Sequence, residues 1–179
     1  MNNKREVYIS VDVETSGPIP GEFSMLTIGA CDAYRPEVAF GCSIKPTTLN
    51  ADPEALAVTG LSLTELARNG LDPKEAMRQF GEWVATAVGG DGMPVFVGFN
   101  APFDWSFVNY YFWRYGGSNP FGFSALDIKS LYMGAKKSTW KDTRSTTMKK
   151  MLGACTEGTH DALEDARFQA ELFRLILAS

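Results

Sequence analysis

The strongest constraint on the fold is a short β-branched segment near the N-terminus, residues 7–13, which reads VYISVDV. Val7, Ile9 and Val11 alternate with the intervening side chains, which is the period-two pattern of a β-strand. A strand with so much apolar material needs cover from other elements. We therefore expect it to be a central strand, around which the rest of the chain is arranged.

The next segments carry first strand patterns and then a helix pattern. Two apolar segments, residues 25–33 and 38–45, have Arg35 and Pro36 as turn residues between them, which predicts a hairpin beside the first strand. Residues 72–90 begin with Asp-Pro, continue with apolar side chains at helical spacing and end with two glycines. This pattern predicts an amphipathic helix.

The second half of the chain repeats the change from strand to helix. Residues 94–98, reading PVFVG, predict a buried strand, and the aromatic-rich residues 102–115 predict a helix. Residues 160–177 form the last long helical pattern. Strands and helices in this order predict an α/β fold with a mixed sheet. Since the 179 residues contain no linker or repeat, we expect one domain, residues 1–179.

The charge and cysteine content exclude several classes of protein. A formal net charge of -4 argues against binding nucleic acid by bulk positive charge alone. No segment approaches the roughly 20 apolar residues that cross a bilayer, so neither a membrane role nor a signal peptide is expected. Cys31, Cys42 and Cys155 lack the CxxC spacing of structural zinc sites and are odd in number. They favour reduced thiols and a cytoplasmic location.

Two acids, Asp12 and Glu14, stand at the end of the first predicted strand. The period-two geometry of a strand sends both carboxylates to the same face, where an unpaired buried charge is costly. The simpler alternative is that one of the two acids is a helix cap or an ion-pair partner. A hard divalent cation explains both acids, because Mg²⁺ and Mn²⁺ prefer oxygen ligands and relieve the repulsion between carboxylates.

Three further residues that could take part in catalysis or metal binding lie near the starts of later predicted helices. Asp104 follows the second buried strand in the first turn of its helix, where capping alone would explain it. His160 is the only histidine, and Asp165 follows it in the last helical pattern. Five helical positions rotate two side chains by roughly 140° relative to one another. Both therefore reach one site only if His160 lies in the preceding loop, and His160 alone would be interpreted as a surface or capping residue.

Taken together, three short motifs resemble the signature motifs of the DEDDh 3′-to-5′ exonucleases, the superfamily of polymerase proofreading subunits and ribonuclease T. The motifs are Asp12-x-Glu14, Asn100-x-x-x-Asp104 and His160-x4-Asp165. The resemblance covers the chain from residue 7 to the final helix. It implies a ribonuclease H-like fold, in which a mixed central sheet is flanked by helices and the motif carboxylates converge at one edge.

The resemblance also implies a role for each motif residue. Asp12 would bridge two divalent cations, Mg²⁺ or Mn²⁺, while Glu14 and Asp165 would hold the ion on the side of the nucleophile. Asp104 would support the second ion, and His160 would be the general base. The implied reaction releases nucleoside 5′-monophosphates from a free 3′ end of single-stranded DNA or RNA.

Four more residues are implied to bind substrate: Thr59, Leu61, Asn100 and Phe103. Thr59-Gly60-Leu61 is similar to the substrate-binding turn of the family, and Leu61 and Phe103 would pack against the terminal base. Phe99 departs from the family pattern, because many relatives have histidine before the motif asparagine. Contacts of that histidine therefore do not transfer to this chain.

Several alternatives stay open at the level of sequence. Basic residues between 136 and 150 surround Trp140 and either follow a phosphate backbone or form a solvated charged face. A catalytically inactive nucleic-acid-binding module of the same fold and a metal phosphatase acting on small phosphoesters are the rival functions. The choice between DNA and RNA depends on contacts near the sugar. Neither that choice nor the oligomeric state follows from the sequence.

Overall fold

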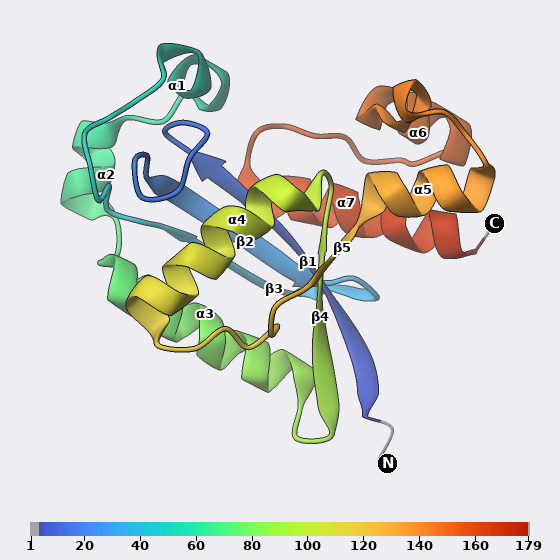
Figure 1. The fold of residues 1–179 in the computed structure, drawn as a ribbon, viewed down its shortest axis with the longest axis horizontal. Helices are drawn as coiled ribbons and strands as arrows, with labels where there is room; N and C mark the ends of the chain where they lie inside the picture. Colours follow the sequence, from blue (N-terminus) through green and yellow to red (C-terminus); the bar gives the residue numbers. More distant parts are fainter. Residues whose placement is uncertain (1–3, 179) are drawn as a thin grey trace.

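The computed structural model describes residues 4–178, which form one five-stranded sheet with helices on both faces (Figure 1). The strands are β1 (Arg5–Thr15), β2 (Met25–Asp32), β3 (Arg35–Ser43), β4 (Gly92–Gly98) and β5 (Ala125–Asp127). The α-helices are α1 (Pro53–Thr59), α2 (Leu63–Asn69), α3 (Pro73–Val88), α4 (Ala101–Tyr111), α5 (Ile128–Lys136), α6 (Ser145–Leu152) and α7 (Ala162–Leu177). A π-helical turn, Phe112–Gly116, extends α4, and a 3₁₀ turn, Trp140–Thr143, precedes α6.

The central position expected for the first strand is confirmed. The strand order is β3-β2-β1-β4-β5, with β1 antiparallel to β2 and parallel to β4. The sheet is therefore mixed, as predicted. Along β1, Val7, Ile9, Val11 and Val13 are buried in the core that includes α3 and α4. The side chains between them face the opposite layer, where α7 and α5 pack.

The predicted turn between the second and third strands is wrong. Arg35 and Pro36 belong to β3, and Arg35 pairs with Asp32 across the hairpin. Asp32 Oδ1 accepts hydrogen bonds from the backbone N–H groups of Tyr34 and Arg35, while its Oδ2 lies 2.6 Å from the Arg35 guanidinium. These contacts turn the chain at Ala33 and Tyr34, which local turn propensity does not reveal.

The start of α7 lies directly on β2. A Cβ atom added to Gly29 would stand 2.2 Å from backbone atoms of Ala162 and Leu163, so only glycine permits this approach. Ala166 and Ala170 continue the close packing along α7, and both are fully buried. As a result, the loop before α7 reaches the carboxyl end of β1.

Two side-chain caps fix the helices nearest to that edge. Asp161 is the N-cap of α7, and its Oδ1 accepts from the N–H groups of Leu163 and Glu164. Asp127 is the N-cap of α5, and its Oδ2 also accepts from the N–H of Ala101 at the start of α4. Among residues 4–178, no helix has the length and hydropathy needed to span a bilayer.

Candidate active site

The first motif lies at the carboxyl end of the central strand, on the face covered by α7. Asp12 and Glu14 are both partly buried there, two residues apart on β1. Asp12 Oδ1 accepts a hydrogen bond of 2.5 Å from Nε2 of Gln169 in α7. The expectation that both carboxylates share one face is therefore confirmed.

The second motif approaches the same strand from α4. The Asp104 side chain is only 4% exposed, and its Oδ1 accepts from the backbone N–H of Val13 at 3.1 Å. Val13 lies beyond the last residue of β1 that pairs with β4. The hydrogen bonds between these two strands therefore leave the Val13 N–H without a partner, and Asp104 supplies one. Asn100 precedes α4 with φ of 63° and makes no side-chain cap.

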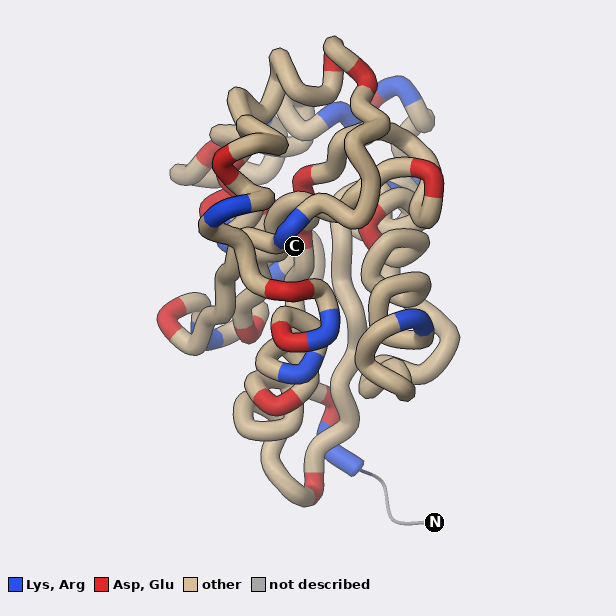
Figure 2. The backbone as a smooth tube through the Cα atoms, turned by 90° about the vertical axis from the view of Figure 1, so that its left-hand side faces the viewer, with Lys and Arg blue, Asp and Glu red and all other residues tan. Residues whose placement is uncertain are grey.

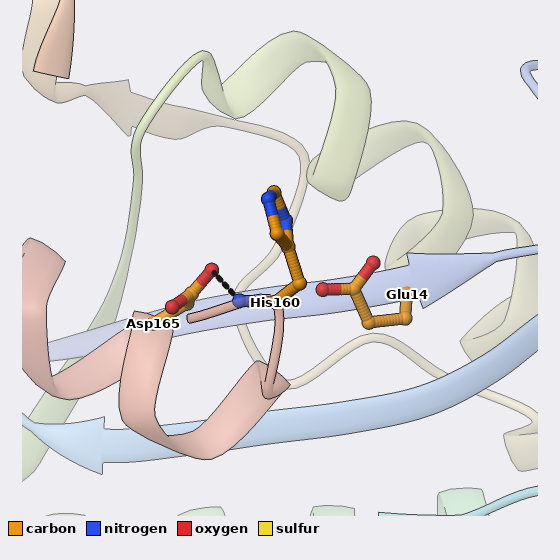
Figure 3. A group of neighbouring side chains, drawn as sticks. All are labelled: Glu14, His160 and Asp165. Carbon is orange, nitrogen blue, oxygen red and sulfur yellow. Dashed lines mark hydrogen bonds between the residues drawn. The ribbon is translucent and has the colours of Figure 1, made fainter. Parts of the chain in front are cut away.

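The third motif brings an imidazole and a carboxylate to Glu14. One ligand atom from each of Glu14, His160 and Asp165 lies within 4.8 Å of the others. Figure 3 shows the Glu14 carboxylate turned toward His160, whose ring projects from the loop before α7. His160 thus lies outside the helix, which is the condition that the sequence set for His160 and Asp165 to share a site.

Asp165 holds the loop that carries the histidine. Its Oδ1 accepts from the N–H of Thr159 at 2.6 Å, and its Oδ2 accepts from the N–H of His160 at 3.3 Å. His160 itself has φ of 60°, a left-handed conformation that is uncommon for residues other than glycine. The imidazole is therefore presented by a constrained backbone and is exposed to solvent.

Burial and like charge raise the pKa values of Asp12, Glu14 and Asp104. Burial, with Asp104, Glu14 and Asp165 nearby, holds the pKa of Asp12 well above its usual range. Burial raises the pKa of Glu14 to about 7, with a further contribution from Asp165. Burial also raises the pKa of Asp104 to about 8, although the Val13 N–H opposes that shift.

The arrangement fits divalent cations. Within residues 4–178, none of the four motif carboxylates takes part in an ion pair with lysine or arginine. Crowded carboxylates without a cationic side chain repel one another, and a hard cation with oxygen ligands removes that repulsion. Asp12, Glu14, Asp104 and Asp165 could therefore hold metal.

The raised pKa values predict how stability depends on pH without metal. Folded-state pKa values of about 7 and 8 lie above the unfolded values of about 4. Their contribution to stability is complete below the unfolded value and is lost as pH rises through about 8. In EDTA, Tm should therefore rise by roughly 3 °C or more between about pH 8 and about pH 5.5.

Thermal unfolding of the parent and of Asp104→Asn measures this effect. The variant should show a smaller rise, because the amide does not titrate but still accepts from Val13. Added Mg²⁺ or Mn²⁺ should raise Tm more at the higher pH, where the ligands are ionised. An equal pH dependence in both proteins would contradict the proposed source of the effect.

Three of the four residues implied to bind substrate line two hollows beside Glu14. Thr59 and Phe103 line one of about 280 Å³, together with Val58 at the end of α1. Leu61 lines another of about 550 Å³, which also touches His160. Asn100 is in neither lining, and its backbone carbonyl accepts from the Phe103 N–H.

Sequence reasoning missed Gln169 as a member of the site. Besides donating to Asp12, its Oε1 accepts from the Phe99 N–H at 2.9 Å, so it links the end of β4 to the first motif. Gln169 follows Asp165 by four residues in α7, which places both on one helical face. The four-residue spacing from Asp165 is the feature of the sequence that could have identified Gln169 as part of the site.

Residues 9–173 match the sequence model of the exonuclease family RNase_T. The chain belongs to this exonuclease family. It is also 57% identical over 176 residues to the 3′-5′ DNA exonuclease Cap18 of Escherichia coli. The alignment covers 98% of this chain and 94% of that protein. The prediction of a 3′-to-5′ exonuclease is thereby confirmed, and the inactive binding module and the metal phosphatase are disfavoured.

Solved structures confirm the ribonuclease H-like fold. The nuclease domain of 3′hExo, a DEDDh family member bound to rAMP, superposes with a TM-score of 0.78 at 13% identity, covering 100% of this chain and 96% of that one. Exonuclease I of E. coli in complex with a dT13 oligonucleotide superposes with a TM-score of 0.72 at 17% identity, and the match covers 97% of this chain and 41% of that one. At such identities the likeness concerns the fold.

Proposed function

We propose that this exonuclease removes nucleotides from the 3′ end of single-stranded DNA, with Asp12, Glu14, Asp104, Asp165 and His160 as its catalytic residues. The observation that carries the proposal is the convergence of Glu14, Asp165 and the only histidine within 4.8 Å, from segments far apart in sequence. DNA is favoured over RNA by the 57% identity to a DNA exonuclease. We propose residues 1–179 as one catalytic domain that acts in the cytoplasm.

Each acid has a separate part in holding two divalent cations, which we propose to be Mg²⁺ or Mn²⁺. When bound, such ions stabilise charge on the attacking and leaving oxygens of a phosphodiester. Asp104, Glu14 and Asp165 all lie close enough to Asp12 to raise its pKa. Asp12 would hold both ions, Glu14 and Asp165 would hold the ion on the side of the nucleophile, and Asp104 would support the second ion.

His160 is suited to accept the proton of the attacking water. The imidazole stands at the exposed rim of the site, and the carboxylates of Glu14 and Asp165 lie beside it. The loop that carries the ring is held by Asp165, which accepts from the backbone N–H groups of Thr159 and His160. After transfer, the neighbouring carboxylates stabilise the imidazolium.

The hollows position the terminal nucleotide. Phe103 and Val58 offer apolar surface to a base of any identity, and Thr59 lines the same hollow. Leu61 lines the neighbouring hollow together with Glu14 and His160. We propose Thr59, Leu61 and Phe103 as contacts of the terminal nucleotide, and Asn100 as a contact at the edge of this region.

The polarity and the substrate are tested on matched oligonucleotides. Single-stranded DNA with a free 3′ end should be digested to nucleoside 5′-monophosphates only when Mg²⁺ or Mn²⁺ is added. A 3′-phosphate or a duplex end should slow digestion, because the terminal nucleotide has to fit against the hollows beside Glu14. RNA of the same sequence should be digested more slowly than DNA.

Two controls separate this activity from others. Circular single-stranded DNA has no end and should survive, whereas its cleavage would identify an endonuclease. Mononucleotides should not release inorganic phosphate, whereas turnover of mononucleotides without turnover of oligonucleotides would identify a phosphatase. Faster digestion of RNA would overturn the assignment to DNA alone.

A further inference from the structure

A cavity of about 340 Å³ opens between α6 and the catalytic carboxylates. Asp12, His160 and Asp165 line one side of it, together with Gln169. Three side chains of α6 line another side: Ser145, Thr146 and Lys149. The proposed function assigns no role to these three side chains of α6.

Charge distinguishes this cavity from the two hollows on the other side of the site. The hollow with Thr59 carries Glu14 and Glu54, and the hollow with Leu61 carries Glu14, Asp161 and Glu164. Of the described residues that line these three spaces, Lys149 is the single lysine or arginine. This cavity also carries Asp12, Asp165 and Glu157, so a second phosphate there would depend on the positive charge of Lys149.

Local charge matters because the chain has no broad excess of positive charge. The formal net charge is -4. Figure 2 shows Lys and Arg interspersed with Asp and Glu along the backbone in that view. A phosphate next to the catalytic acids consequently depends on individual donors placed at the right point.

The side chains on α6 supply such donors. Ser145 and Lys149 are four residues apart and Thr146 and Lys149 three apart, so the three side chains share one helical face. Two hydroxyls and one ammonium group can all donate to phosphate oxygens. Phe99 adds an aromatic surface to the same cavity, against which a base can pack.

Lys149 already has an anionic partner, which shows where its ammonium group reaches. Its Nζ lies 2.7 Å from Oε2 of Glu157, another residue of the cavity lining. The Glu157 side chain is 74% exposed, and ion pairs so exposed contribute little to stability. A phosphate that enters the cavity can therefore replace the Glu157 carboxylate.

We propose that this cavity binds the nucleotide on the 5′ side of the scissile phosphate, and that Lys149 leaves Glu157 to contact the 5′-phosphate of that nucleotide. The inference rests on the proposed function, which places the terminal nucleotide beside Thr59 and Phe103. The strand then leaves the site on the opposite side of the carboxylates, where the cavity lies. Lys149 is thus a substrate-binding residue.

Two dinucleotides that differ by one phosphate test this placement. The parent should hydrolyse d(pTpT) with a KM about tenfold lower than that for d(TpT), the usual scale of one charged contact. Lys149→Gln should remove this preference by raising KM for d(pTpT) alone. Glu157→Gln should lower KM for d(pTpT) a few-fold, since phosphate no longer competes with the carboxylate.

The matched control is Lys150→Gln, which removes the same charge from the exposed neighbouring position of α6. It should keep the parent preference between the two dinucleotides. A preference that survives in Lys149→Gln, or an equal loss in Lys150→Gln, would overturn the proposal. An equal rise in KM for both dinucleotides in Lys149→Gln would show a structural role instead.

Binding provides a readout that does not require hydrolysis. In the Asp104→Asn background, fluorescence anisotropy with a single-stranded DNA should give a Kd about tenfold higher after Lys149→Gln. The slope of log Kd against log salt should become shallower by about 0.7, as expected for the loss of one phosphate contact. If the parent hydrolyses no substrate, the proposed function fails, and this binding measurement still decides the role of Lys149.

Discussion

Asp12→Asn and Asp104→Asn should each lower kcat by roughly 10³-fold or more, because each removes a carboxylate from the group that holds the cations. Both substitutions preserve shape and hydrogen bonding. An amide oxygen at residue 12 still accepts from Gln169, and one at residue 104 still accepts from the Val13 N–H. The loss should therefore arise in catalysis and not in folding.

Stability provides the check on this interpretation. Because burial and repulsion raise the pKa values of both acids, the neutral amides should leave Tm in EDTA unchanged or higher at about pH 8. Calorimetric titration with Mn²⁺ should show weaker binding in both variants. Parent-like kcat in either variant, with the fold intact, would show that the substituted acid does not take part in the reaction.

His160→Ala and Asp165→Ala should separate proton transfer from metal binding. Loss of the imidazole should lower the rate by roughly 10²- to 10⁴-fold, the usual scale for a general acid or base, and should keep most of the affinity for Mn²⁺. Loss of Asp165 should weaken Mn²⁺ binding as well. It should also release the loop, since Asp165 accepts from the N–H groups of Thr159 and His160.

Single-turnover kinetics and metal calorimetry on both variants measure the two effects. Because His160 is exposed, added imidazole should restore part of the rate in His160→Ala and none in Asp165→Ala. Asp161→Ala is the matched control, since it removes a neighbouring acid that caps α7 and costs about 1 kcal/mol of stability. It should keep the parent rate. Loss of metal in His160→Ala with retention in Asp165→Ala would reverse the proposed roles.

Local patterns were sufficient to predict the elements that carry the site. The alternation along residues 7–13 indicated a central strand, and the structure places β1 third in the sheet of five. The two-residue spacing of Asp12 and Glu14 indicated a shared face. The helical angle between His160 and Asp165 indicated a loop position for the histidine. Each inference needed only backbone geometry within a few residues.

Long-range contacts required the tertiary structure. Gln169 reaches Asp12 from the other end of the chain, and this pairing depends on where α7 crosses the sheet. The crossing is in turn set by the close approach at Gly29. Strand order and helix position combine many weak contacts, and the periodicity of a single segment contains no information about its neighbours.

The sequence by itself determined the family resemblance, the α/β class and the acidic motifs, since these depend on residue type and local spacing. Only the tertiary structure decided the left-handed backbone of His160, the double cap by Asp127 and the placement of Lys149 in the catalytic cavity. The basic segment was ambiguous in sequence because charges on a helix point in all directions. Packing of α6 beside α7 decides which of those side chains face the site.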